Sequence, residues 1–265
     1  MADKLISEGI CTFCSKTYKK GGINRHLIKE LEEMSKNGKP GKSFLLKVEP
    51  DPSWGRSPYF LSIWMDGEMK MDELDNFLRK IWLECCGHMS AFVDVKKRAQ
   101  TSGTWGFFDA QELLEKGKVK QYEKMMEEQS GEIPMSRKVK NVFEKGKKLE
   151  YQYDFGSTTQ LQIEVVAEYP VKAEKKYFLL SRNEPLKIKC SSCSDKMATQ
   201  LCSVCAAYDN DAIFCDSCAK KHAKECDDFD DYAAMPVVNS PRMGVCAYDG
   251  GMIDKKRDRV AVAVK

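Results

Sequence analysis

Residues 190–226 read CSSCSDKMATQLCSVCAAYDNDAIFCDSCAKKHAKEC, a run in which seven cysteines and one histidine recur at short intervals. Two Cys-x2-Cys pairs are followed by Cys-x2-Cys-x3-His-x3-Cys. A Cys-x2-Cys turn directs two thiolates at one ion, and eight soft ligands complete two closed tetrahedral zinc sites. We therefore predict a two-zinc module over 190–226, with its ligands at Cys190, Cys193, Cys202, Cys205, Cys215, Cys218, His222 and Cys226.

The eight ligands can be shared between two ions in two ways. In a cross-brace, the first and third cysteine pairs hold one ion, and the second pair holds the other together with His222 and Cys226. In a sequential arrangement, the first four cysteines share one ion and the last four ligands share the other. We favour the cross-brace, because the layout resembles that of B-box and related treble-clef modules. Four protein ligands leave no open position, so we expect the zinc to be structural.

Closely spaced cysteines can also form disulfides, which are typical of secreted proteins. The chain opens with Met1-Ala2-Asp3-Lys4 and continues in polar sequence, without the apolar stretch of a signal peptide. It has no apolar run of the ~18 residues that a membrane span needs. We therefore expect a cytoplasmic protein with no membrane partner, and metal binding in place of disulfides.

Composition bounds the class of protein. The 265 residues are 42% hydrophobic, which is enough for a folded core, and suit one or two domains with small modules. The 43 basic and 40 acidic residues leave a formal net charge of +3. This balance predicts no strong nonspecific attraction to nucleic acid, although local patches can still act.

Residues 1–38 carry the first three ligands of a small zinc finger, Cys11, Cys14 and His26, ahead of and within a helix expected over 24–34. The expected fourth ligand is missing, and Glu30 stands one helical turn after His26. Two interpretations are open. The site is a weakened zinc site completed by Glu30 or water, or the segment is a degenerate finger that folds without metal.

The core domain is expected over 43–189, after a linker rich in glycine and lysine. Strands are predicted at 43–49, 59–65, 91–95, 149–155, 159–167, 176–181 and 186–189, and a helix over 72–85. The absence of a regular strand–helix–strand repeat indicates an α+β fold, a mixed sheet-and-helix core. A lysine-rich, mostly helical stretch over 110–146 is either a phosphate-contacting face or an ordinary solvated surface, and its interleaved glutamates favour the second.

The tail, 227–265, starts with an acidic stretch at 227–231 and continues with an apolar run at 236–248 that we expect to dock on the folded body. The last ten residues are expected to be loose.

Four soft or ionisable side chains near the end of the predicted helix remain unassigned: Glu84, Cys85, Cys86 and His88. A cysteine beside His88 could be an activated nucleophile with its base. More simply, Cys85 and Cys86 could be buried core cysteines. In a third alternative, Cys246 returns to join them in another metal site.

Three strings, FLRKIWLECCGH at 77–88, YQYDFG at 151–156 and NSPRMGVC at 239–246, resemble the Ri-plasmid open-reading-frame-three-like family, also described as insertion-element passenger proteins of the TnpR type. The resemblance implies an α+β core over 43–189 and an association with mobile DNA, with no agreed activity. The zinc module and tail look like the longer, metal-binding branch of that family. Two features depart from it: Ser157-Thr158-Thr159 replaces an acidic residue followed by tryptophan, and Glu30 stands where the family's finger commonly ends in cysteine.

These observations predict a zinc-binding macromolecular interaction protein with no enzymatic activity. Two zinc ions are expected in the C-terminal module and a third is possible at the N-terminus. A protein partner is favoured by the acidic stretch at 227–231 and the near-neutral charge. The alternative is a nucleic-acid-binding protein linked to mobile elements, and a Cys/His enzyme is a distant third.

Overall fold

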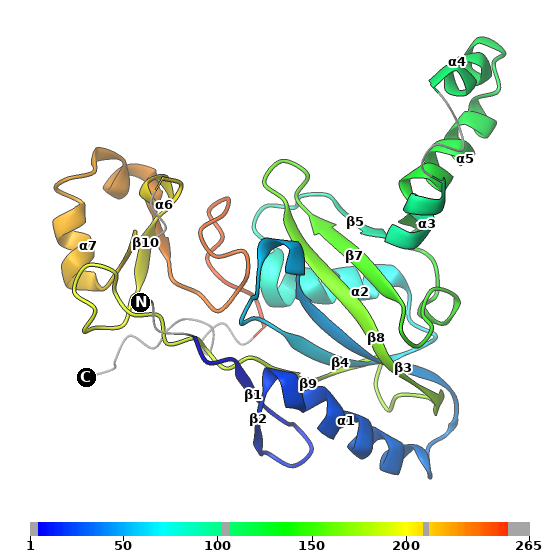
Figure 1. The fold of residues 1–265 in the computed structure, drawn as a ribbon, viewed down its shortest axis with the longest axis horizontal. Helices are drawn as coiled ribbons and strands as arrows, with labels where there is room; N and C mark the ends of the chain where they lie inside the picture. Colours follow the sequence, from blue (N-terminus) through cyan, green and yellow to red (C-terminus); the bar gives the residue numbers. More distant parts are fainter. Residues whose placement is uncertain (1–4, 102–106, 209–211, 254–265) are drawn as a thin grey trace.

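The core is a seven-stranded sheet with the order β6-β5-β7-β8-β3-β4-β9, in which every neighbouring pair is antiparallel. The computed structural model describes residues 5–101, 107–208 and 212–253 (Figure 1). The expected α+β class is confirmed, because the sheet mixes with helices that follow no parallel crossover pattern. The strands are β3 (Pro40–Pro50), β4 (Leu61–Asp66), β5 (Ser90–Val93), β6 (Glu132–Ile133), β7 (Lys148–Tyr153), β8 (Thr159–Val171) and β9 (Tyr177–Arg182).

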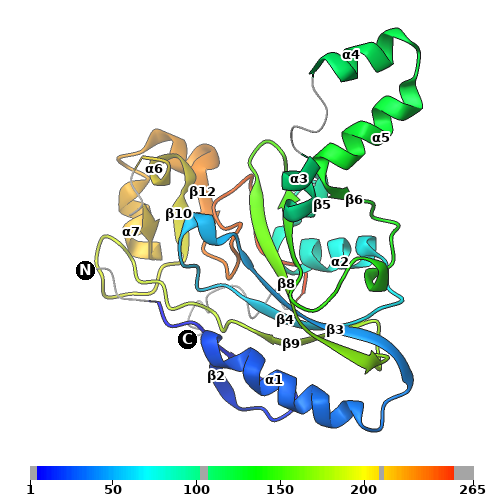
Figure 2. The ribbon, with the colours of Figure 1, turned by 45° about the vertical axis from the view of Figure 1, so that its right-hand side comes forward.

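Helices cover both faces of this sheet (Figure 2). On one face, α1 (Lys20–Ser35) buries Ile23, Leu27 and Leu31, which recur at helical spacing and form its apolar stripe. On the other face lies α2 (Met71–Leu78), which continues as the π-helical turn η2 (Arg79–Leu83). The helix expected over 24–34 is therefore longer, and it is a layer of the core rather than an isolated finger helix.

A bulge at the centre of the sheet lets one long strand serve both layers. Leu46 of β3 pairs with Val165 of β8, but Leu45 pairs with Ala167, so Val166 is an extra residue on β8. Alternation along β8 buries 161, 163 and 165 on the α2 face. After the extra residue, the same odd-numbered positions, starting with Ala167, face α1. The pattern of burial stays regular while the buried face changes.

Two predicted elements differ from the structure. Residues 186–189 form no strand, and only Lys189 pairs, in an isolated bridge with Met197. The lysine-rich helical stretch ends earlier than expected, because α5 (Val119–Ser130) is followed by β6 and by the short helix η3 (Val139–Asn141), whose Val139 is buried in the core. With α3 (Val95–Thr101) and α4 (Phe107–Glu115), α5 makes an arm that projects from the body (Figures 1 and 2). Within the described residues, no helix has the length and apolar character that a membrane crossing requires.

The apolar run of the tail docks on the core, as expected. The Ser240 hydroxyl donates to the Trp82 carbonyl oxygen at 2.7 Å, and the Met252 backbone N–H donates to Lys80 O at 2.7 Å. Gly251 lies so close to η2 that a Cβ there would clash with the Ile81 carbonyl oxygen, so only glycine fits. The last ten residues, predicted to be loose, lie outside the described residues.

Truncation of Ile163, which is fully buried at the centre of β8, tests this account of the core. We expect Ile163→Ala to lower the free energy of unfolding by about 2–5 kcal/mol, because it removes buried apolar contacts and leaves a cavity. The measurement is chemical denaturation of the zinc-loaded protein. The control is Gln162→Ala, which changes the neighbouring, only partly buried position. Equal effects of the two substitutions would contradict the assigned faces.

Candidate metal centres

The cysteines and histidines of the chain gather in four groups. The chain has 12 cysteines and three histidines, and every one belongs to a group whose ligand atoms all lie within 4.8 Å of one another. All twelve cysteines are free thiols. Such complete use of soft ligands indicates metal coordination, because cysteine in a core serves as an ordinary small hydrophobe and need not cluster.

The first group consists of Cys190, Cys193, Cys215 and Cys218. The first pair lies in a turn before the hairpin of β10 (Gln200–Cys202) and β11 (Ile213–Phe214). The second pair flanks the start of α7 (Asp216–His222), because Cys215 is its N-cap residue. The Sγ atoms of Cys193 and Cys215 lie 3.9 Å apart. Two thiolates bound to one tetrahedral zinc at about 2.3 Å lie about 3.8 Å apart, so the spacing fits a shared ion.

The second group consists of Cys202, Cys205, His222 and Cys226. Cys226 Sγ lies 3.9 Å from Cys202 Sγ and 3.8 Å from Cys205 Sγ. The His222 ring is held between aromatic rings, stacked on Phe214 at 4.4 Å and edge-on to Phe229 at 5.1 Å. Its Nε2 is buried and has no hydrogen-bond partner among the described residues, an orphan that a metal ion would satisfy.

These two groups are the ligand sets of the cross-brace. The fold does not bring together the ligand sets of the sequential arrangement. The reason is the antiparallel pairing of β10 with β11, which places the turn before β10 beside the start of α7. The third strand of this small sheet, β12 (Ala234–Pro236), pairs with the other edge of β10. The more specific likeness to treble-clef and B-box modules stays a prediction.

Contacts within the module shift the pKa values of its thiols in opposite directions. Hydrogen bonds from the Ser217 hydroxyl and the Cys218 backbone N–H lower the pKa of Cys215 to about 6. Burial, with the adjacent thiols of Cys202 and Cys226, raises the pKa of Cys205 to about 12. Neighbouring thiols cannot all ionise by themselves, because the thiolates repel one another, and a bound divalent cation removes that obstacle.

The third group consists of Cys11, Cys14 and His26. The two cysteines lie in the turn between β1 (Glu8–Ile10) and β2 (Thr17–Lys19), and His26 comes from α1. Cys14 Sγ lies 3.3 Å from His26 Nε2. Glu30 Oε1 lies 3.5 Å from the same nitrogen, but the carboxylate is not part of the group with mutual separations within 4.8 Å. Three of the four expected ligands therefore converge, and Glu30 stands beside them.

One feature of this N-terminal site was missed by sequence reasoning. The turns at Cys11 and at Cys190 are built alike: the backbone N–H of Ser15 donates to Cys11 O at 2.9 Å, and that of Ser194 donates to Cys190 O at 2.9 Å. Both serines adopt left-handed backbone conformations, with φ of 56° and 57°. The available signal was the shared Cys-x2-Cys-Ser string. The likeness indicates that the N-terminal turn has the backbone of a metal-binding turn.

The fourth group consists of Cys85, Cys86, His88 and Cys246, which joins the core to the tail. The expectation of a core residue is wrong for Cys86, which is exposed, whereas Cys85 is half-buried and packs against the core. Cys86 Sγ faces His88 Nε2 at 3.0 Å. Hydrogen bonds with Cys246 and Cys85 raise the pKa of Cys86 to about 12, whereas burial is outweighed by hydrogen bonds from Arg242 and Cys86 that lower the pKa of Cys85. The interpretation of these residues as a nucleophile with its base stays a prediction.

Comparisons with known proteins leave the family open. No family model and no curated protein matches the chain. A match among solved structures is the crystal structure of a protein of unknown function, MM3350, from Methanosarcina mazei Go1. It is 15% identical, with a TM-score of 0.33, and covers 51% of this chain and 64% of that one, less than two thirds of its length. The resemblance to the Ri-plasmid open-reading-frame-three-like family therefore stays a prediction.

Removal of one thiolate from the module tests its zinc content. We expect Cys226→Ser to lower the bound zinc by one ion per chain and to lower the melting temperature, because a structural ion contributes its binding free energy to folding. The measurement is elemental analysis of the purified full-length protein with a thermal scan. Ser192→Ala, at an exposed position in the same module, is the control. Unchanged zinc in Cys226→Ser would exclude this centre.

Glu30 provides a separate test at the N-terminus. We expect Glu30→Cys to tighten zinc binding at the N-terminal site, because a third thiolate would replace a more weakly bound oxygen ligand. Glu30→Ala should weaken zinc binding there about 10–100-fold, the size of effect typical of a group that supports a metal site. Competition with a chromophoric chelator measures both. Glu33→Ala, at an exposed position on the same helix, should have no effect, and equal affinities in all three variants would show that residue 30 takes no part.

Proposed function

We propose that this protein is a zinc-binding, protein-interaction adaptor in which the zinc ions are structural. The observation that carries the proposal is the charge of the surface built on the two-centre module. Residues 190–232 contain four lysines and no arginine against nine acidic residues, an excess of five negative charges in a chain whose formal net charge is +3. A negative surface repels the phosphate backbone of nucleic acids and suits a basic segment of a protein.

Exposed aromatic side chains support a protein partner. Tyr208 is 91% exposed and Tyr232 is 68% exposed, and both belong to residues 190–232, which we call the acidic module. Tyrosine is enriched in protein interfaces, because it combines a large apolar area with a polar end at low cost in side-chain entropy. The module therefore combines negative charge with two aromatic anchors, and we propose that it docks a basic protein surface.

The role of the zinc follows from the size of the module. Among the described residues, its hydrophobic cluster has six buried members, three of which are alanines, a small apolar core for holding a fold by hydrophobic burial. Each of its two ligand groups has four members, so a tetrahedral ion bound there has no open position for catalysis. This supports zinc as a structural component and supports an interaction protein over an enzyme.

The lysine-rich stretch offers less support for nucleic-acid binding than its sequence suggests. Lys138 and Lys140 both pair with Glu68, at 2.7 and 2.5 Å. Lys147, directly after the stretch, pairs with Asp94 at 2.8 Å. Charges that are already paired within the protein contribute less to a phosphate-binding face. This supports the solvated-surface interpretation, and we therefore keep the protein partner as the proposal.

The experiment compares partner capture by full-length, zinc-loaded variants. Cross-linking and mass spectrometry in native cell extract identify the captured proteins, and we expect the wild type to capture a discrete set. The double variant Tyr208→Ser with Tyr232→Ser should capture at least tenfold less of these proteins. Met126→Ser, at a 45% exposed position on the projecting arm, is the matched control and should retain the set. Capture by the tyrosine variant at the level of the control would contradict the module as the docking surface. Steeply salt-dependent binding to random DNA or RNA would overturn the proposal in favour of nucleic acid.

A further inference from the structure

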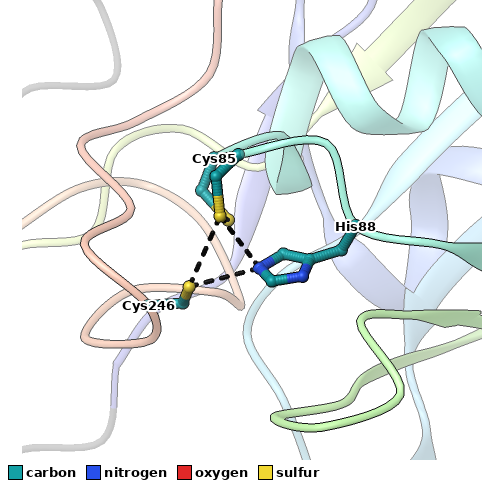
Figure 3. A group of neighbouring side chains, drawn as sticks. Cys85, His88 and Cys246 are labelled. Carbon is teal, nitrogen blue, oxygen red and sulfur yellow. Dashed lines mark hydrogen bonds between the residues drawn. The ribbon is translucent and has the colours of Figure 1, made fainter.

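We propose that Cys85, Cys86, His88 and Cys246 form an additional zinc site that fastens the C-terminal segment to the core. The four residues come from two parts of the chain about 160 positions apart, and their ligand atoms all lie within 4.8 Å of one another. Figure 3 shows Cys85 and His88 on one side and Cys246, carried by a loop of the tail, on the other, with all three side chains pointing toward a common centre. The inference concerns a site outside the acidic module.

The separations fit one tetrahedral ion. Cys86 Sγ lies 3.7 Å from both Cys85 Sγ and Cys246 Sγ. His88 Nε2 lies 3.0 Å from Cys86 Sγ and 3.2 Å from Cys246 Sγ. Ligands bound to one zinc at about 2.3 Å for sulfur and about 2.0 Å for nitrogen lie roughly 3.8 and 3.5 Å apart. Sulfur–sulfur distances of 3.7 Å also match those within the module, where they are 3.8 and 3.9 Å.

The backbone is shaped to bring these ligands together. After η2 ends at Leu83, the Gly87 N–H donates to Glu84 Oε1 at 2.6 Å, and Gly87 adopts φ of 78°, so the chain turns back and presents His88 beside Cys86. On the tail, Cys246 and Ala247 both adopt left-handed conformations, with φ of 49° and 50°. Consecutive residues with a Cβ rarely do so, and such strain persists where another interaction maintains it. Cys246 is exposed, so burial of its side chain does not supply that interaction, and a bound metal would.

Polar groups around the cluster resemble the supporting shell of a metal site. Arg242 is fully buried, and its Nη2 donates to Asp154 Oδ2 at 2.7 Å and to Cys85 Sγ at 3.5 Å. Its guanidinium lies over the Tyr153 ring at 4.8 Å. Three thiolates and one zinc ion carry a net charge of −1, which the nearby guanidinium offsets. Asp154 Oδ2 lies 3.5 Å from His88 Nε2, the ligand nitrogen itself, so this carboxylate supports the cluster through Arg242 and not through the second ring nitrogen of His88.

The donor set selects the kind of ion. Three thiolates and one imidazole are soft or borderline ligands, which favour zinc over magnesium or calcium. Four protein ligands close the coordination sphere, so the ion is structural. A disulfide is the competing use of these thiols, but it requires sulfur atoms about 2.05 Å apart, and the cluster also includes a histidine aimed at two of the sulfurs.

This site would couple the acidic module to the core. The chain leaves the module through β12, which pairs with β10, and then runs over the core from 237 to 253. Cys246 lies in this last stretch, so an ion at the cluster would cross-link the segment that carries the module to the end of η2. The tail is therefore held at both ends of its course, by hydrogen bonds near Ser240 and Met252 and by the ion between them.

The test uses full-length protein purified under reducing conditions in the presence of zinc. We expect Cys246→Ser to hold one zinc ion fewer per chain than wild type, by elemental analysis, and to increase hydrogen exchange over 237–253 but not over 190–226. Ala247→Ser is the matched control, because it makes a similar change at the adjacent exposed position and keeps the ligand. The same zinc content and exchange in Cys246→Ser as in the control would overturn the proposal.

A second measurement remains decisive where a variant fails to fold. Cadmium-substituted wild-type protein should give two resonances from three-sulfur, one-nitrogen sites by cadmium NMR, one from the module and one from this cluster. A single such resonance would overturn the proposal. So would mass spectrometry that found Cys86 and Cys246 joined by a disulfide in freshly purified, zinc-loaded protein.

Discussion

The pairing of β3 with β8 is the interaction on which the rest of the structure depends. These are the two longest strands, they lie side by side at the centre of the sheet, and β4 and β7 extend the sheet from their outer edges. The single extra residue at Val166 lets β8 contribute buried side chains to both faces. One face therefore receives α1, which carries His26, and the other receives α2 and η2, which lead into Cys85, Cys86 and His88.

The metal-ligand groups lie where segments with little core of their own meet the rest of the protein. The N-terminal hairpin meets α1 at Cys11, Cys14 and His26, and the tail meets the end of η2 at Cys246. The hydrophobic cluster of the C-terminal module has six buried members among the described residues, and the module holds two groups. Hydrophobic burial scales with the size of a segment, so short segments rely on other cross-links, and metal–thiolate bonds supply strong ones.

This arrangement separates the stability of the core from the placement of its attachments. The central sheet and its two helices form two large apolar clusters. The acidic module and the tail are linked to that core through polar contacts, such as the pair of Arg242 with Asp154, and through the ligand groups. In the proposed adaptor, zinc therefore governs how the interaction surface is presented rather than whether the core folds.

The sequence alone determined the class of fold, most strand positions and which side chains gather as candidate ligands in the C-terminal module, because alternating burial along β8 and the Cys-x2-Cys spacing are local patterns. It also placed Cys11, Cys14 and His26 together, since a hairpin and the following helix are close in the chain. The tertiary structure alone decided three further points: which ions the eight module ligands would share, that α1 belongs to the core, and that Cys246 lies beside Cys85, Cys86 and His88. From the sequence, the contact of Cys246 with these residues was one of three alternatives, and no sequence feature selected it. The physical reason is that a contact between residues so distant in sequence depends on the packing of the whole sheet, which no local spacing records.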